Sequence, residues 1–548
     1  MANKKNRISD KFKFTKYLEI GSPDAETDQL LEKAFVEKDA LFALTDMYNQ
    51  RSILIGRTGS GKSAILKHIE NNEERVIRIE PEAMSLRFLS NSTLINYFKA
   101  NDVNLNFFYK ILWKHVFVIE LLRLYFAYDN KKKDNWFFAL KEKLGKKQNP
   151  KRLKALEYFD KWSNEFWIDT EKRIKEIESI VQKKFENEIG IDLNHIKGKH
   201  GQNSSDQTKI TTEVKTKAEH VITETLANDI HEIIKILHEE LFVDQQQKHF
   251  IIIDDLDKEW IATDIRYELI GAMIEVIKEF QVFKGVKIII SLRDNLYQLL
   301  FSGKNHKGGQ REKFKPLYAE LSWSAMELKE FLNKRFFLLS QDNLDIKTAF
   351  DKTYQKGIDG FTYMLERTFY RPRDVISYVN HAIENSNNKS NFSLDVLKRA
   401  EIDYSKDRLQ AMEDEWGENY GDIRKIFKFL FTKHNGFLVN SIKEDEFTDI
   451  LFDSHPDLIF NGELLAWIRL WQAESVKFSD FLQNILYLLY QFGIIGVKKD
   501  SEYPIQFFYE KNIDLTLNDI HPNSKIYIHK AFYSALKINV KELEPKAY

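Results

Sequence analysis

The sequence contains no cysteine, which excludes disulfide bridges, thiolate metal sites and cysteine nucleophiles. This absence fits a reducing compartment, so we predict a cytoplasmic protein. A long uncharged apolar run is also lacking. The most apolar stretch, residues 105–128, carries Lys110, Lys114, Glu120 and Arg123, and charges at that density oppose insertion into a bilayer. We therefore expect a buried or amphipathic helix there and no membrane partner. The basic first residues precede no apolar core, so no signal peptide is expected.

The chain lacks an excess of charge of either sign. Lysine and arginine number 82 and aspartate and glutamate 83, for a formal net charge of −1. Overall charge therefore draws the chain neither to nucleic acid nor to acidic lipid, and such a site requires local segregation of charge. A length of 548 residues, 43% of them apolar and 30% charged, predicts an ordinary globular chain of several domains.

One glycine-rich segment matches a complete nucleotide-binding motif. Residues 56–63 read Gly-Arg-Thr-Gly-Ser-Gly-Lys-Ser, between an apolar strand at 52–55 and a helix from Ser63. Glycines let backbone N–H groups face phosphates, Lys62 is expected to contact the β- and γ-phosphates, and the Ser63 hydroxyl is expected to bind Mg²⁺. We predict binding of ATP and Mg²⁺ through Gly56, Arg57, Thr58, Gly59, Ser60, Gly61, Lys62, Ser63 and Ala64.

A second motif supplies carboxylates at the end of a buried strand. Residues 250–253 are apolar and are followed by Asp254, Asp255 and Asp257. Asp254 is predicted to be a ligand of the hydrated Mg²⁺, and Asp255 to orient the attacking water, with Asp257 the next candidate for that role. The alternative is a solvated acidic turn.

Four arginines are further candidates for the site. Arg293 follows the strand at 286–290, where it or Ser291 could sense the γ-phosphate. Arg311 lies in a polar loop before the strand at 318–321 and is predicted to act as a finger on a neighbouring subunit. Arg371 and Arg373 flank Pro372 at the start of a helix, from which they could fold back onto the nucleotide. For each of them the alternative is a capping or solvated side chain.

The alternation of apolar runs and helical patterns predicts an α/β P-loop core with a parallel five-stranded sheet. We expect a helix at 27–48 and a strand at 75–79, and near the C-terminus a helix at 478–492 followed by two short strands, which is the outline of a winged helix. The expected domains are residues 1–84 (first half of the core), 85–247 (helical insertion, with a polar loop at 200–206), 248–340 (second half of the core), 341–411 (helical lid) and 412–548 (helical and winged-helix-like domain).

These motifs together resemble the STAND and AAA+ side of the P-loop ATPases. More narrowly, the segments at 21–28 (Gly-Ser-Pro-Asp-Ala-Glu-Thr-Asp), 321–324 (Leu-Ser-Trp-Ser) and 371–374 (Arg-Pro-Arg-Asp) resemble the bacterial FunZ-type ATPases. The resemblance runs from about Tyr17 to Tyr404, and it implies a context in anti-phage defence islands. Two features argue against a motor ATPase: the long gap from Ser63 to Asp254, and Asp255 at the position where many such ATPases carry glutamate. The shorter carboxylate suggests slow, switch-like hydrolysis.

We therefore predict a Mg²⁺-dependent ATPase that acts as a conformational switch, forms a homo-oligomer and controls a separately encoded protein effector. The alternative is an ATP-regulated nucleic-acid-binding protein. It would use the winged helix, with a basic patch of Lys498, Lys499, Lys525, His529 and Lys530, or the basic segment at 141–154, which contains Lys146, Lys147, Lys151 and Arg152. A transporter-type (ABC) ATPase needs a signature loop upstream of the strand that ends in its metal-binding carboxylate. The only similar string here, Gly308-Gly309-Gln310, lies downstream of Asp257, so this class is excluded. A GTPase is excluded because no guanine motif is present.

Overall fold

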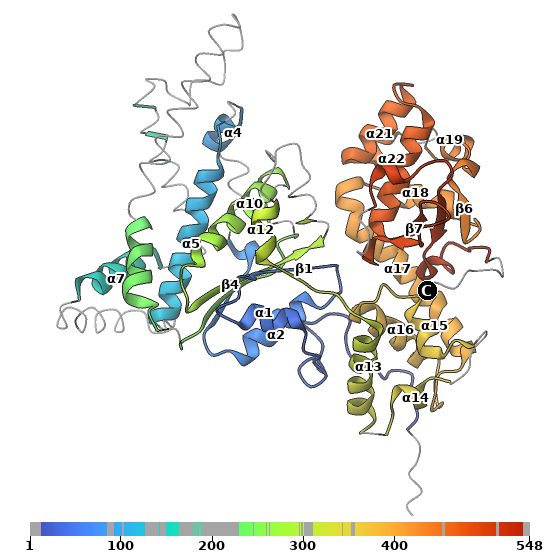
Figure 1. Ribbon diagram of the computed structural model, residues 1–548, viewed down its shortest axis with the longest axis horizontal. Coiled ribbons are helices and arrows are strands. Elements are labelled where there is room, and N and C mark those ends of the chain that lie inside the picture. The colour runs from blue at the N-terminus through green and yellow to red at the C-terminus, as the bar shows by residue number, and fades with distance from the viewer. Residues whose placement is uncertain are drawn as a thin grey trace, which may run out of the picture. The chain divides into compact units, whose positions relative to one another are not determined.

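The computed structural model describes residues 12–84, 93–100, 103–126, 149–163, 230–244, 246–258, 260–261, 263–294, 296–297, 300, 311–341, 343–351, 357–451, 455–510 and 515–540, and single positions at 142, 179, 182, 183, 186 and 187 (Figure 1). The chain forms two compact units. One is Glu37–Ser322, and the other combines Met1–Val36 with Trp323–Tyr548. This division differs from the domain boundaries expected above, since the first residues join the C-terminal part.

The unit Glu37–Ser322 is built on a five-stranded parallel sheet, as predicted. Its strand order is β2-β3-β4-β1-β5. The residues of β1, β3 and nearly all of β4 are buried, which explains why these strands appear in the sequence as unbroken apolar runs. The strands are β1 (Ile53–Gly56), β2 (Val76–Ile79), β3 (His249–Ile253), β4 (Val286–Arg293) and β5 (Tyr318–Glu320).

Helices cover both faces of this sheet. Figure 1 shows α1 (Asp39–Thr45) and α2 (Lys62–Asn72) on one side and α5 (Asn106–Phe126) and α10 (Thr263–Phe280) on the other. The chain runs from β1 to β2 in one direction across the sheet and from β2 through β3 to β4 in the opposite direction. Right-handed crossovers therefore place α2 and the pair α5 and α10 on opposite faces.

Part of the segment between β2 and β3 belongs to the core of this unit. Helix α5 packs against α10 and against β3, and Trp113 on α5 donates a hydrogen bond to the carbonyl of Leu269 over 2.8 Å. Part of the segment expected to be an insertion is thus the crossover that covers one face of the sheet. The other described elements of this segment are η1 (Pro81–Met84), α4 (Thr93–Ala100), α7 (Pro150–Ser163) and η4 (Leu237–Leu241). The polar loop expected at 200–206 lies outside the described residues.

The helix predicted over residues 27–48 is wrong except for α1. Residues 27–36 form turns and irregular backbone, because the Asp28 carboxylate accepts the backbone N–H of Leu30 over 3.1 Å and pairs with Arg335. A side chain that bonds its own backbone in this way competes with a helix.

In the other half of the core, α12 (Arg311–Phe314) and η5 (Lys315–Leu317) lead into β5.

The second unit begins with helices and ends on a small sheet. Helix α13 packs on α14 and α16, and α16 on α17. The C-terminal sheet is antiparallel with the order β6-β9-β7-β8. The helix expected at 478–492 is present as α22, and the two strands expected after it are present as β7 and β8, although the sheet has four strands. Among the described residues no helix is long and apolar enough to cross a bilayer.

The helices of the second unit are α13 (Ala325–Ser340), α14 (Ile346–Ala349), α15 (Gly360–Leu365), α16 (Pro372–Glu384), α17 (Leu394–Tyr420), α18 (Arg424–Phe427), α19 (Asp445–Leu451), α20 (Pro456–Ile459), α21 (Gly462–Gln472) and α22 (Phe478–Phe492). Short helical turns are η7 (Lys428–Leu430), η8 (Val439–Ser441), η9 (Phe508–Glu510), η10 (Leu517–Asp519) and η11 (Lys530–Phe532). The strands are β6 (Gly436–Leu438), β7 (Ile495–Lys498), β8 (Gln506–Phe507) and β9 (Lys525–Ile528).

Candidate nucleotide site

The loop between β1 and α2 has the backbone geometry of an anion-binding turn. Gly59 and Gly61 have φ values of 75° and 94°, a region that side-chain-bearing residues rarely enter. Gly61 stands at the N-cap of α2, and no side chain caps the helix there. The first N–H groups of α2 are therefore available to an anion, which the helix dipole also favours.

Lys62 is held inside this loop. Its Nζ donates to the carbonyl of Gly56 over 2.9 Å and to that of Arg57 over 3.1 Å. Burial, and then the nearby charge of Arg293, lower the pKa of Lys62 to about 8. The ammonium thus binds carbonyl oxygens of its own loop, which keeps it where phosphates would arrive.

Asp254 lies directly after β3, and both of its carboxylate oxygens are engaged. Ile253 is the register partner of Ile290, so Ser291 stands beside Asp254, and the Ser291 hydroxyl donates to Oδ1. Arg78 donates to Oδ2 over 3.3 Å. The carboxylate is only 5% exposed. The side chain predicted to bind the metal is therefore fixed in orientation by two donors from neighbouring strands.

Arg78 was not among the residues singled out from the sequence. It is the register partner of Ile252, two residues before Asp254, so Arg78 and Asp254 project from the same face of the sheet. The only signal in the sequence is a charged residue between the apolar Ile77 and Ile79. That signal cannot identify a partner 176 positions away.

The other two aspartates have different surroundings. Asp255 is 38% exposed, has a φ of 57° and pairs with Lys258 over 2.9 Å. Asp257 pairs with Arg293 over 2.6 Å, and burial raises its pKa although the charge of Arg293 acts against the shift. Arg293 is the register partner of Gly56, so this ion pair lies at the start of the P-loop. The carboxylates are thus distinct groups with distinct partners.

The oxygen donors at this edge of the sheet fit Mg²⁺. This ion takes oxygen ligands and is bound in nucleotide sites by one or two protein groups together with phosphate oxygens and water. The Ser63 hydroxyl and the Asp254 carboxylate are the protein groups that would hold it. Among the described residues no three His, Cys, Asp or Glu side chains cluster as a metal site. A site that depends on phosphates as ligands requires no such cluster.

The remaining arginines lie elsewhere in the chain. Arg311 begins α12, and its side chain is outside the described structure. Arg371 and Arg373 belong to the second unit. Arg371 is buried and donates from Nε to Asp374 Oδ2 over 2.8 Å and from Nη2 to Oδ1 over 2.9 Å. Burial acts to raise the pKa of Asp374, but the charges of Arg371 and Arg408 hold it below its usual range.

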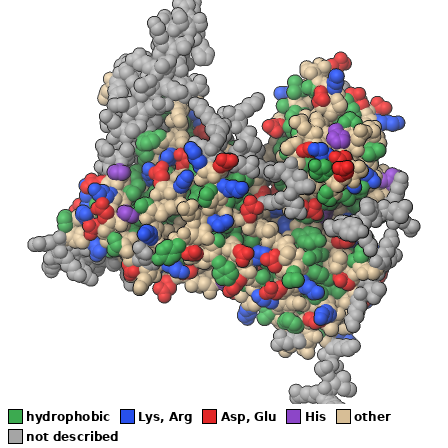
Figure 2. All heavy atoms as spheres, in the orientation of Figure 1, with side chains coloured by type: hydrophobic (Ala, Val, Ile, Leu, Met, Phe, Trp, Pro, Cys, Tyr) green, Lys and Arg blue, Asp and Glu red, His purple; other side chains and the backbone are tan. Residues whose placement is uncertain are grey.

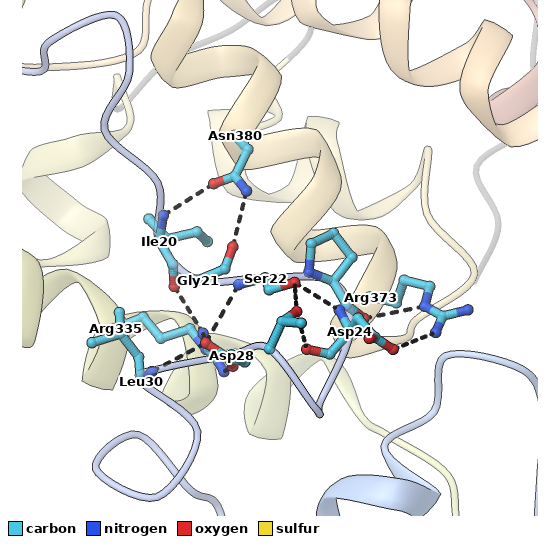
Figure 3. Close-up of polar contacts among 11 residues, drawn as sticks. Ile20, Gly21, Ser22, Asp24, Asp28, Leu30, Arg335, Arg373 and Asn380 are labelled. Atoms are coloured by element: carbon cyan, nitrogen blue, oxygen red, sulfur yellow. Dashed lines mark hydrogen bonds and ion pairs between the residues drawn. The ribbon is translucent and has the colours of Figure 1, made fainter.

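Arg373 is oriented differently. Its Nε donates to the carbonyl of Pro23 over 3.2 Å, and Nη2 lies 3.9 Å from Asp24 (Figure 3). Arg371 is therefore committed to a buried ion pair, whereas Arg373 holds the turn at residues 21–28. Contact of either with a nucleotide stays a prediction.

The basic segments proposed for nucleic acid are largely neutralised where they are described. Lys151 pairs with Glu240 over 2.9 Å and with Glu239 over 3.3 Å, and Arg152 donates to the carbonyl of Glu240. Lys146 and Lys147 lie outside the described residues. On the face drawn in Figure 2, described basic and acidic side chains are intermingled.

The C-terminal basic patch is similarly balanced. Lys499 pairs with Asp519 over 2.5 Å, Lys530 pairs with Glu366 over 3.1 Å, and His529 is buried. The other two residues of the patch, Lys498 and Lys525, are cross-strand neighbours at one end of the sheet.

Comparison with known proteins gives a match in the second unit. Residues 326–413 match the FunZ-associated C-terminal helical domain. The chain is 23% identical over 320 residues to the transposon gamma-delta 80.3 kDa protein of Escherichia coli (strain K12), and the alignment covers 55% of this chain and 42% of that relative. The chain therefore spans less than half of the relative that it matches.

Two solved structures align along most of the chain. One is the Walker-type ATPase PABY2304 of Pyrococcus abyssi, with a TM-score of 0.37, 11% identity, and coverage of 92% of this chain and 96% of that one. The other is Cdc6p of Pyrobaculum aerophilum, with a TM-score of 0.28, 11% identity and 93% coverage of both chains. Because both TM-scores are low, the fold assignment rests on the strand order and the P-loop. The chain combines a P-loop core of the Walker type with a helical region similar to the FunZ-associated C-terminal domain.

Proposed function

We propose that the chain is a Mg²⁺-dependent ATPase of the P-loop class. The observation that carries the proposal is that the candidate phosphate-binding and metal-binding groups lie together at one edge of the sheet. The uncapped N-terminus of α2 and Lys62 lie at the end of β1, and Asp254 and Ser291 lie at the ends of β3 and β4. Ligands of parallel α/β sheets bind outside the carboxyl ends of the strands, and this edge offers donors for phosphates and oxygens for a metal.

The residues of the site have separate tasks in this proposal. Backbone N–H groups of residues 59–63 and the ammonium of Lys62 bind the phosphates. Ser63 and Asp254 hold Mg²⁺, which supplies neutralisation of phosphate charge. Asp255, the most exposed of the three aspartates, accepts a proton from the attacking water or orients it. Arg293 neutralises Asp257 at rest and is near enough to the P-loop to respond to the γ-phosphate.

We infer further that turnover is slow and serves a switch. Asp255 is one methylene shorter than the glutamate common at this position, and it is paired with Lys258 at rest, so water activation requires a rearrangement. A homo-oligomer with Arg311 as a finger and an effector partner also belong to this proposal. A role in anti-phage defence belongs to it as what the resemblance to FunZ-type ATPases implies. The nucleic-acid alternative is the weaker one, because acidic side chains already pair with Lys151, Lys499 and Lys530 among the described basic candidates.

Calorimetric titration of ATP in the presence of Mg²⁺ tests the binding proposal. Wild type is expected to bind, and Lys62→Ala to lose measurable binding while its thermal melting remains cooperative. Lys67→Ala, on the same helix, is the matched control and is expected to bind as wild type does. Equal ATP affinity for Lys62→Ala and wild type would overturn the assignment of this loop.

A further inference from the structure

Arg78 on β2 lies between two carboxylates. Its Nη2 is 3.3 Å from Asp254 Oδ2, and its Nη1 is 3.7 Å from Glu70 Oε2 on α2. The two carboxylates differ in exposure: the side chain of Asp254 is 5% exposed and that of Glu70 is 40% exposed. The guanidinium therefore bridges the helix that begins at the P-loop and the strand that ends at the candidate metal ligand.

The bond to Asp254 matters because of where it lies. Ser291 already donates to Oδ1 of this carboxylate, and Arg78 occupies Oδ2, so neither oxygen is without a donor. A guanidinium and a divalent cation both seek the negative charge of a carboxylate. Hence a cation that approaches Asp254 has to compete with Arg78.

Glu70 offers Arg78 a second position. The guanidinium can turn toward Glu70 without leaving its place on β2, because the distance to Glu70 is only slightly longer than the distance to Asp254. A move of this kind keeps the charge of the arginine compensated. The ion pair with Glu70, on the last turn of α2, is then the one that remains.

We propose that Arg78 is the resting counterion of Asp254, that Mg²⁺ displaces it when nucleotide binds, and that Glu70 then receives the guanidinium. This inference rests on the proposed binding of Mg²⁺ and nucleotide at this edge of the sheet. Arg78 is a positioning residue in it, since it acts through Asp254. The consequence is a raised requirement for Mg²⁺, which keeps the empty site from holding the ion without nucleotide.

A purely structural role for Arg78 predicts the opposite effect of its removal. If the guanidinium only orients Asp254 for the metal, its loss leaves the carboxylate free to rotate and Mg²⁺ binds less well. If the guanidinium competes, its loss improves Mg²⁺ binding. The sign of the change thus separates the two roles.

The test measures the affinity of a fluorescent ATP analogue as a function of Mg²⁺ concentration, with an EDTA arm as the reference. For Arg78→Gln we expect the Mg²⁺ concentration at half-maximal effect to fall roughly three- to tenfold, as removal of one charge-assisted bond at a partly exposed site should give. Arg75→Gln, which removes the same charge just before β2, is the matched control and should leave that concentration unchanged.

Glu70→Gln supplies an independent variant at an exposed position, in case Arg78→Gln fails to fold. Without its second partner Arg78 stays on Asp254, so the Mg²⁺ requirement should rise. The same change in the Arg78→Gln background should have little effect, because the arginine it acts through is gone. An additive effect of Glu70→Gln in both backgrounds would show a general field effect and overturn the coupling.

The outcomes separate this inference from the function on which it rests. If wild type binds the analogue in a Mg²⁺-dependent manner but Arg78→Gln has an unchanged or higher Mg²⁺ requirement, the competition is refuted and the proposed function stands. If wild type shows no binding with or without Mg²⁺, the proposed function fails and this inference fails with it.

Discussion

Asp28 and Arg335 form a fully buried ion pair, with Arg335 Nη2 2.5 Å from Asp28 Oδ2 and the side chains 2% and 1% exposed (Figure 3). Arg335 also donates to the carbonyl of Ile20 over 2.8 Å, and a Cβ added to Gly21 would lie 2.0 Å from its Nη1. Gly21 has a φ of +127°, which a side chain would strain in any case. The segment at 21–28, one of those that resemble FunZ-type ATPases, is thus bound to α13 through Arg335.

Loss of this pair should destabilise the second unit strongly. Asp28→Asn leaves the positive charge of Arg335 buried without its partner, and removal of one member of such a pair costs about 3–5 kcal/mol. We expect the first thermal unfolding transition to move to a lower temperature. Asp24→Asn, at an exposed position of the same turn, is the control and should melt as wild type does. Equal melting of both variants would show that the pair contributes nothing net.

The pKa of Lys62 predicts how ATP affinity depends on pH. Burial lowers this pKa to about 8, so the side chain loses its proton above that pH in the nucleotide-free protein. Phosphates favour the charged form and raise the pKa, so nucleotide binding takes up a proton in this range. Affinity should therefore fall as the pH rises above about 8, approaching tenfold per unit, and remain nearly constant below it.

Calorimetry near pH 8.5 in two buffers of different ionisation enthalpy measures that proton uptake directly. The apparent binding enthalpy should differ between the buffers for wild type. Buffer-independent heat, together with an affinity that stays constant between about pH 7 and 9, would show that Lys62 is already charged in the empty site.

Asp255→Asn should separate binding from chemistry. The change removes the negative charge that would accept a proton from the attacking water or orient that water, but it leaves Asp254 and the P-loop intact. ATP and Mg²⁺ should bind as in wild type, and phosphate release should fall roughly a hundredfold or more. Glu82→Gln, an acidic residue close enough to influence Lys258, is a control for the loss of charge. Full turnover in Asp255→Asn would transfer the role to Asp257, whose pKa is raised by burial.

The sequence predicted the sheet and the loop well because their signals are local. Each buried parallel strand is a continuous apolar run, and the P-loop is a contiguous motif. The helix at 27–48 was wrong because an ion pair between Asp28 and Arg335, separated by 307 positions, outweighs local helical periodicity. The same limit hid Arg78, whose partner Asp254 lies 176 positions away. Contacts between distant residues decided each of these cases.

Arg311 provides a test of assembly. If it acts on the nucleotide of a neighbouring subunit, wild type forms a homo-oligomer and Arg311→Ala lowers hydrolysis without weakening ATP binding. Mixing Arg311→Ala with Lys62→Ala should then restore part of the activity, since a Lys62→Ala subunit supplies the arginine and an Arg311→Ala subunit supplies the nucleotide. Lys313→Ala, on the same short helix, is the control. A strictly monomeric wild type with full turnover would refute the finger.

The final prediction concerns DNA, and it depends on charge pairing. Phosphate contacts dominate non-specific DNA affinity, and each contact contributes about one to the slope of log affinity against log salt. Lys151 already lies within 3.3 Å of Glu239 and 2.9 Å of Glu240, so a phosphate would have to displace two carboxylates. We therefore expect wild type to show no DNA binding by fluorescence anisotropy at physiological salt. Replacement of Lys146, Lys147, Lys151 and Arg152 by glutamine should change nothing there. Micromolar or tighter binding by wild type that loses its salt dependence in this variant would favour the nucleic-acid alternative over the ATPase switch.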